Sequence, residues 1–113
     1  MKAVRFKDSH ITRGNDLIKT YTFTTQNAAL DLTVYQTIKA DLRKGLTRKS
    51  ELIKSINLLD GIDILGVNNN VLRLDFGKID ISGELWFDVE LELDGVNTTF
   101  GFGKVEVREN ITV

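Results

Sequence analysis

The chain contains no cysteine and no proline, and it has only one histidine among its 113 residues. Without cysteine it cannot form disulfides, thiolate nucleophiles or cysteine-ligated zinc sites. Proline commonly protects the exposed edges of β-sheets, so charge or a covering segment must do so here. A net charge of −1 provides no overall field that would attract nucleic acid or acidic lipid.

Long hydrophobic runs are also missing. No apolar stretch approaches the roughly 20 residues that cross a bilayer, and the first residues, MKAVRF, lack the apolar core of a secretory signal. We therefore expect a soluble product of the cytoplasm. The length suits a single domain covering residues 1–113. A content of 42% apolar and 27% charged residues is typical of a globular fold.

The clearest pattern is strict alternation over residues 84–93 (ELWFDVELEL). The aliphatic residues and phenylalanine at odd positions predict a buried face, and Trp86 with the acidic residues predicts a solvated one. Asp94-Gly95 follows, a pair that favours a two-residue hairpin turn. A second strand is then expected to return through residues 96–102.

The register of this hairpin follows from its turn. The expected pairs are Leu93 with Val96, Leu91 with Thr98, Val89 with Phe100, Phe87 with Phe102, and Trp86 with Gly103. In the last pair the indole ring would cover exposed glycine backbone. The apolar phase slips after Gly103, which predicts a β-bulge near Gly103-Lys104 that returns Val105 and Val107 to the core.

Shorter alternating segments predict further strands at residues 17–24, 36–44, 62–64 and 72–76. Gln26-Asn27, Asp60-Gly61 and the asparagines at 68–70 are typical of turns and loops. Together these segments predict an all-β antiparallel sandwich of about six to eight strands.

Residues 50–59 are ambiguous. Leu52, Ile53, Ile56 and Leu59 match helical spacing, and Ser50 is a suitable cap. The same residues fit an irregular strand. The short β segments on either side favour the strand, and a short helix near 50–59 is the alternative.

No arrangement of side chains indicates a catalytic or metal site. His10 stands alone in a polar stretch, so it cannot form a metal cluster, and a surface histidine is favoured over a catalytic one. Asp60, Asp63 and the asparagines at 68–70 offer oxygen ligands, but their spacing fits turns rather than a calcium loop. We expect no enzyme activity, no cofactor and no metal. A basic cluster without interleaved aromatics indicates a solvated loop; it comprises Arg43, Lys44, Arg48 and Lys49.

The acidic face of residues 84–93 is the best candidate for a contact surface. Paired carboxylates can hydrolyse glycosides, but here they alternate along one strand without a cleft, which favours an exposed or subunit-contacting face. Tryptophan is enriched at binding hot spots, so Trp86 is the expected anchor, with the covering of Gly103 as its other role. The candidate interface residues are Trp86, Glu84, Asp88 and Glu90.

Short segments follow one another along most of the chain: residues 11–15 (ITRGN), 30–33 (LDLT), 38–43 (IKADLR), 83–92, 94–95 (DG), 103–107 (GKVEV) and 110–112 (NIT). In order and spacing they resemble a group of small phage virion proteins, in which an Ig-like β domain forms the N-terminal part of baseplate or tail-fibre proteins. The resemblance implies an Ig-like sandwich without enzymatic activity.

The resemblance also implies a biological setting. The protein would be a virion component, made in the host bacterial cytoplasm, that acts as a baseplate, tail or head-fibre adaptor. Its partners would be other virion structural proteins and further copies of itself in a trimer or ring, with no nucleic acid and no membrane. A carbohydrate-binding or adhesion module is the alternative, since small β-sandwiches often host one. Such a module would present Trp86, Tyr21 or Tyr35 on a groove.

Overall fold

The computed structural model describes residues 3–25 and 28–109, and the regular elements of that part are strands apart from one short 3-10 helix. The expected turn at Gln26-Asn27 and the segment 110–112 lie outside the described residues. Within the described ranges no helix is long and apolar enough to cross a membrane. The elements are β1 (Val4–Arg5), β2 (Ser9–Thr12), β3 (Asp16–Thr22), β4 (Thr24–Thr25), β5 (Ala28–Ala29), η1 (Leu32–Val34), β6 (Thr37–Arg43), β7 (Leu52–Leu58), β8 (Gly61–Leu65), β9 (Val71–Lys78), β10 (Gly83–Leu93) and β11 (Val96–Arg108).

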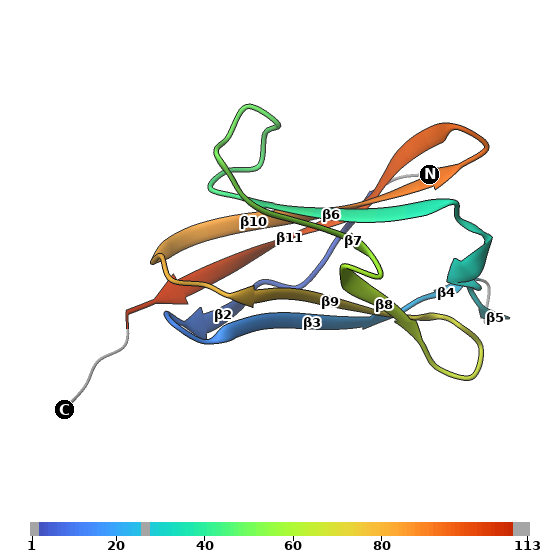
Figure 1. The fold of residues 1–113 in the computed structure, drawn as a ribbon, viewed down its shortest axis with the longest axis horizontal. Coiled ribbons are helices and arrows are strands. Elements are labelled where there is room, and N and C mark those ends of the chain that lie inside the picture. Colours follow the sequence, from blue (N-terminus) through green and yellow to red (C-terminus); the bar gives the residue numbers. More distant parts are fainter. Residues whose placement is uncertain (1–2, 26–27, 110–113) are drawn as a thin grey trace.

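Nine strands form one hydrogen-bonded sheet in the order β1-β11-β10-β6-β7-β8-β9-β3, with β2 also paired to β11. Strands β4 and β5 form a separate small hairpin. The sheet curls until β6, β10 and β11 face β3, β8 and β9, as the two layers in Figure 1 show. The result is a half-barrel whose apolar side chains fill the space between the layers.

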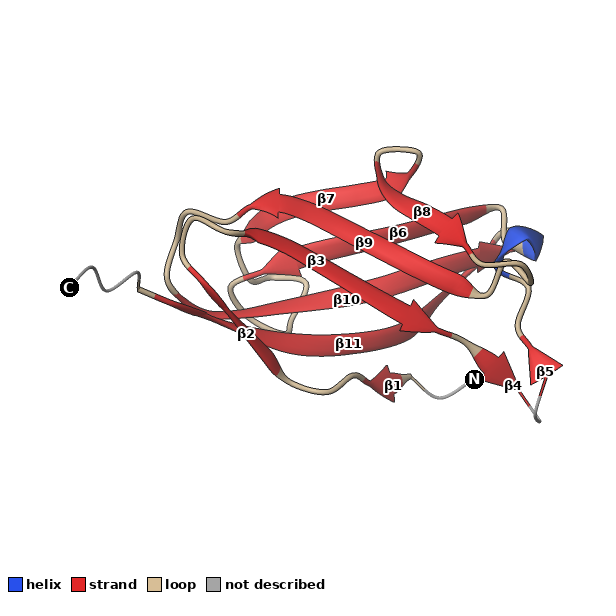
Figure 2. Ribbon diagram, turned by 90° about the horizontal axis from the view of Figure 1, so that it is seen from below, coloured by secondary structure: helices blue, strands red, loops and turns tan. Residues whose placement is uncertain are grey.

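The all-β prediction is confirmed, but the expected sandwich of antiparallel sheets differs from the observed arrangement. The ladder does not break between the layers, because β7 pairs with β6 along one edge and, through Asn57 and Leu58, with β8 along the other. The sheet is also mixed, since β1 and β2 run parallel to β11 along its outer edge (Figure 2). The alternation patterns predicted neither of these two N-terminal strands.

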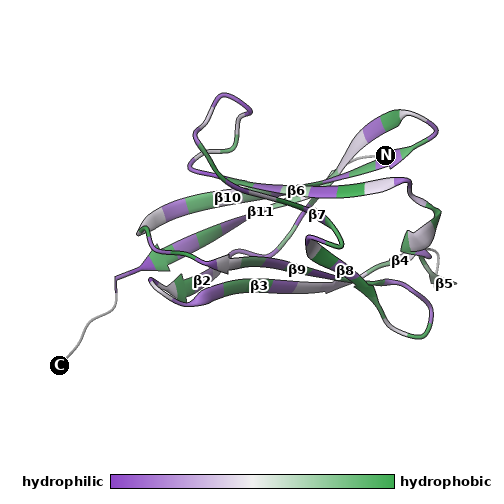
Figure 3. Cartoon of the chain, in the orientation of Figure 1, coloured by the Kyte–Doolittle hydropathy of each residue, from purple (hydrophilic) through white to green (hydrophobic). Residues whose placement is uncertain are grey.

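Alternation located the longer strands correctly. In Figure 3 apolar and polar residues alternate along β9, β10 and β11. The prediction that Leu93 also points inward is wrong, since it is 44% exposed at the end of β10. The other predicted inward positions of β6, β9 and β10 are buried: Ile38, Ala40, Leu42, Leu72, Leu74, Phe76, Leu85, Phe87, Val89 and Leu91. Leu17 and Phe23 are buried at either end of the predicted strand 17–24, of which β3 forms most.

Residues 50–59 contain the strand β7 and no helix, which confirms the preferred prediction. Of the four apolar residues that match helical spacing only Ile56 is buried, and Leu59 lies in the following turn with 95% of its surface exposed. Pairing with β6 decides the conformation, because it places Ile56 beside Ala40 in the core. Ser50 lies in the loop before the strand, where its hydroxyl is 3.1 Å from that of Thr47.

The β10–β11 hairpin turns at Asp94-Gly95 as predicted, with φ values of 53° and 79°, and Leu93 lies opposite Val96. The bulge exists, but its predicted position was wrong. The register shifts between Glu90, which faces Thr99, and Val89, which faces Gly101. The predicted pairs of Val89 with Phe100 and of Phe87 with Phe102 are therefore wrong.

A stack of aromatic rings explains where the bulge lies. Phe6 stacks on Tyr21 with ring centroids 4.2 Å apart, and it lies 5.9 Å from Phe87. These rings occupy the core side of β11 at Gly101 and Gly103, where a Cβ atom would approach Phe6 to 2.5 Å and Phe87 to 2.8 Å. The shift at Val89 turns both glycines toward the rings and still leaves the two valines beyond them, Val105 and Val107, in the core as predicted.

Candidate functional site

Trp86 lies on the outer face of β10, half-buried under two cations. The Arg5 guanidinium is 5.6 Å and the Lys104 ammonium 5.9 Å from its ring centroid, distances at which cation–π attraction is significant. Its partner on β11 is Lys104, so the predicted pair with Gly103 was wrong. Gly103 instead faces the core beneath Phe87. The indole ring thus contacts β1 and β11 of its own chain.

Two acidic residues of this face, Glu90 and Glu84, are paired with basic residues around them. Glu90 forms an ion pair with Arg48, whose loop reaches over β10, and only 17% of the Glu90 side chain remains exposed. Glu84 lies 3.9 Å from Lys104. The face is therefore neither flat nor bare, because part of the basic cluster expected to form a solvated loop is bound to it.

Two other members of the basic cluster also have partners. Arg43 donates to the Ser50 carbonyl at 3.1 Å and to Asp41 at 3.3 Å, which ties the loop back to β6. Lys44 lies 3.7 Å from the Glu51 carboxylate. These pairs hold the loop between β6 and β7 against its own domain.

Asp88 is the unusual group of the predicted set. It lies directly opposite Asp41 on the neighbouring strand β6. Asp41 is buried and accepts hydrogen bonds from the Ser55 hydroxyl at 2.6 Å and from Arg43. Asp88 Oδ1 is buried without a hydrogen-bond partner among the described residues.

This environment disfavours the charged form of Asp88. Burial raises the pKa of its carboxyl, and the neighbouring carboxylates of Asp41 and Glu90 raise it further, against the smaller opposing effects of a hydrogen bond to the Asp41 backbone and of Arg43. The cavity beside it, lined in part by Leu46 and Trp86, has a volume of about 10 Å³, which is room for about one water molecule. The charged Asp88 carboxylate therefore destabilises the folded state at neutral pH, and it does not face a ligand site.

We expect the substitution Asp88→Asn to stabilise the protein at pH 7 by about 0.5 to 1 kcal/mol, because it removes a like-charge pair between opposed strand positions. The wild-type group has a raised pKa in the folded state. Its contribution to stability is therefore most favourable below the unfolded value near 3.8 and is lost as pH rises through the folded pKa. The advantage of the variant should grow with pH across this window.

Denaturant unfolding of both proteins between pH 3 and 8 measures this difference. The matched control is Asp60→Asn, which changes an exposed carboxyl in the turn between β7 and β8. A stability difference for Asp88→Asn that stays constant with pH, or that matches the Asp60 control, would contradict a raised pKa of Asp88 in the folded state.

The remaining sequence candidates lie apart from one another. His10 is exposed on β2 beside Glu106 of β11. Asp63 lies 3.8 Å from Arg73 on the neighbouring strand, and the asparagine loop separates β8 from β9. In residues 3–25 and 28–109 no three histidine or acidic side chains gather closely enough to hold a metal ion.

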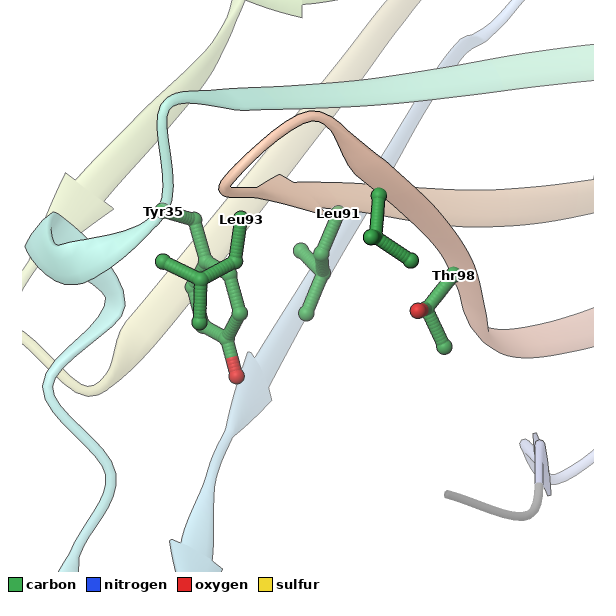
Figure 4. A pocket seen from close by; sticks show the side chains of 5 residues that line it. Tyr35, Leu91, Leu93 and Thr98 are labelled. Carbon is green, nitrogen blue, oxygen red and sulfur yellow. The ribbon is translucent and has the colours of Figure 1, made fainter.

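Sequence reasoning missed an apolar hollow at the end of the β10–β11 hairpin. Its volume is about 230 Å³, and Figure 4 shows its lining side chains, which come from the segment after η1 and from both hairpin strands. They are Tyr35, Leu91, Leu93, Val96 and Thr98. Leu93 is 44% and Val96 64% exposed, and Val34 nearby in sequence is 54% exposed.

The hollow exists because the hairpin extends beyond its neighbour. The pairing of β10 with β6 ends at Glu92 and Thr37, and that of β11 with β1 starts only at Gly101. Leu93 and Val96 therefore have no partner strand on their outer sides. Gln36 holds the hairpin in place, since its backbone N–H donates to the Glu92 carbonyl and its side chain accepts from the Gly95 N–H. The sequence did offer one sign of this hollow: apolar residues continue up to the turn on both strands of the hairpin.

Comparisons with known proteins do not identify the chain: no protein-family model matches it, and no curated protein matches it either.

Proposed function

We propose that this protein is a non-catalytic assembly module, a phage virion adaptor that docks another structural protein through the end of its β10–β11 hairpin. The observation that carries the proposal is the exposed apolar hollow with Leu93 and Val96 at its rim. Large exposed apolar groups that surround a concave surface are typical of protein interaction sites. The partner in this proposal is a virion protein, or a further copy in a trimer or ring, that inserts an apolar side chain.

The all-β fold agrees with this proposal at the level of class. The two facing layers of the curled sheet are compatible with an Ig-like relationship. The unbroken ladder and the parallel N-terminal strands differ from a sandwich of two separate antiparallel sheets.

The geometry also changes which residues carry the contact. The predicted anchor Trp86 already contacts Arg5 and Lys104, and Glu84 and Glu90 are paired within the chain. These residues support the sheet that presents the hairpin. We therefore assign the docking role to the hairpin end in place of the acidic face.

The carbohydrate-binding alternative has weaker support. Of its three aromatic candidates only Tyr35 lines the large hollow. Tyr21 is stacked under Phe6, and Trp86 lies under two cations beside a cavity of about 10 Å³. The hollow offers the hydroxyls of Tyr35 and Thr98 among otherwise aliphatic side chains. Sugars need many convergent hydrogen bonds, so this lining suits an apolar side chain better.

The double variant Leu93→Asp/Val96→Asp tests the proposal. We expect the wild-type chain to self-associate with increasing concentration, and the variant to weaken that association by at least about tenfold, which corresponds to about 1.4 kcal/mol. Light scattering over a concentration series measures the mass of both proteins.

The matched control is Leu59→Asp/Val67→Asp, which changes the same residue types at positions 95% and 100% exposed outside the hollow. Equal association of both double variants would exclude the hairpin end as the contact. A wild-type chain that stays monomeric at every concentration would contradict the trimer or ring.

A further inference from the structure

The N-terminal segment, residues 3–12, pairs with the sheet through a single neighbour. Its strands β1 and β2 are hydrogen-bonded to β11 only, at Gly101–Phe102 and at Val105–Arg108. Because the pairing is parallel and the two partners are far apart in sequence, no tight turn joins them. Strand β11 therefore binds this segment much as it would bind a separate extended peptide.

One side chain supplies most of the segment's burial. Phe6 is the only buried residue between positions 3 and 12, with 8% of its surface exposed. Its ring enters a slot lined by Tyr21, Phe87 and the bare backbone of Gly101. A backbone ladder combined with one anchoring side chain is the usual chemistry of β-strand addition.

Two further contacts are partly exposed: Ile11 packs against the core, and the Arg5 guanidinium lies over the Trp86 ring. The remaining polar contacts of the segment are weak. Arg5 pairs with Asp8 inside the segment, and Asp8 lies 3.7 Å from Lys104, both at exposed positions, where ion pairs contribute little. Burial raises the pKa of Tyr21 to about 12. Among the described residues neither its hydroxyl nor that of Ser9 has a hydrogen-bond partner, although both are buried. Two buried polar groups along this seam are thus unsatisfied, which lowers the cost of opening it.

The connection to β3 leaves the segment room to move as a unit. After β2 the chain crosses from the edge of β11 to the opposite layer, where β3 pairs with β9 and not with β2. The crossing is secured by Arg13, whose backbone N–H donates to the Arg108 carbonyl and whose side chain contacts Asp80 and Glu109. These side chains are exposed at the surface, whereas Gly14 and Asn15 pair through their backbones with Ile79 and would stay with β3 when residues 3–12 open.

We propose that residues 3–12 form an exchangeable edge strand, which occupies the β11 edge and the Phe6 slot of a second copy of this chain. The contacts in the exchanged and closed forms are the same, so the balance between the forms depends on concentration. A short tether corresponds to an effective concentration on the order of millimolar, so exchange should become substantial near that protein concentration. The proposal concerns contacts between copies through β11 and does not depend on the hairpin hollow.

Single cysteines in the otherwise cysteine-free chain can trap the exchanged form. His10 and Glu106 are exposed neighbours in the β2–β11 ladder, at a spacing that suits a disulfide. One full-length variant carries His10→Cys and an isotopic label, and the other carries Glu106→Cys unlabelled. They are mixed at about 1 mM, near the effective concentration of a short tether, then oxidised, and mass spectrometry quantifies the mixed covalent dimer.

The control mixture replaces Glu106→Cys with Asp60→Cys, an exposed position in the turn between β7 and β8. The expected result is a mixed dimer well above this control, whose fraction falls severalfold on tenfold dilution. A second pair, Thr12→Cys with Arg108→Cys, tests the same register at another point of the ladder.

If both cysteine pairs give no more mixed covalent dimer than the control mixture, the proposal is overturned. The outcome is separable from the hairpin test, because the same mixture prepared with Leu93→Asp/Val96→Asp should cross-link equally well. A cross-link that disappears with those substitutions would show that the copies meet through the hairpin and would also overturn strand exchange.

Discussion

Replacing Phe6 with alanine should lower the free energy of unfolding by about 3 to 5 kcal/mol, the usual cost of removing a buried phenylalanine ring. The ring is 8% exposed and touches Tyr21, Phe87 and the backbone of Gly101. A domain of this length has a total stability of roughly 6 to 17 kcal/mol, so the variant should still fold. Chemical denaturation monitored by Trp86 fluorescence measures the loss.

The N-terminal segment should be released in this variant, because Phe6 is its only buried residue. Amide hydrogen exchange should then accelerate in β1, in β2 and at the residues of β11 that pair with them. It should accelerate much less in β9. Phe102→Ala is the matched control, since it removes the same ring from a half-buried position of the paired strand. A cost no larger than that of the control would show that the slot does not anchor the segment.

Gly101→Ala should be the second most harmful change, with an expected cost of about 1 to 3 kcal/mol from overpacking. A Cβ atom at this position would lie 2.5 Å from the Phe6 ring and 2.9 Å from the Val4 carbonyl oxygen. Either β1 must move away from β11 or the ring must leave its stack. Denaturant unfolding of the single variant measures this cost.

A double-mutant cycle with Phe6→Ala identifies its cause. Without the ring, the added methyl group has space, so Gly101→Ala should cost at least about 1 kcal/mol less than it does in the wild type, within the usual range of coupling between touching residues. Additive effects of the two substitutions would mean that the Val4 backbone, and not the Phe6 ring, requires glycine at this position.

Local pattern was sufficient to predict several elements, because each depends on neighbouring residues only. The alternation over residues 84–93 defines a strand with one buried face whatever its partners are, and Asp94-Gly95 defines its turn. The strand at 72–76 follows from the same rule. Residues 50–59 were harder, since a short apolar run fits two periods, and the partner strand β6 decided between them.

The candidate site was less predictable, because it depends on which strands become neighbours. Glu84, Trp86, Asp88 and Glu90 do share one face, as alternation requires. Nothing local in the sequence places Asp41 opposite Asp88, or Arg48 of the loop against Glu90. Charges that look free in a linear pattern are paired once β6 and its loop lie beside β10.

The sequence by itself determined the all-β class, the long alternating strands and the β10–β11 turn, since these follow from side-chain period and local backbone preference. Only the tertiary structure decided the rest. The curled single sheet, the parallel N-terminal strands and the position of the bulge depend on contacts between distant residues. Phe6 needs space beside Gly101 that no local pattern predicts, because the ring and the glycine lie near opposite ends of the sequence.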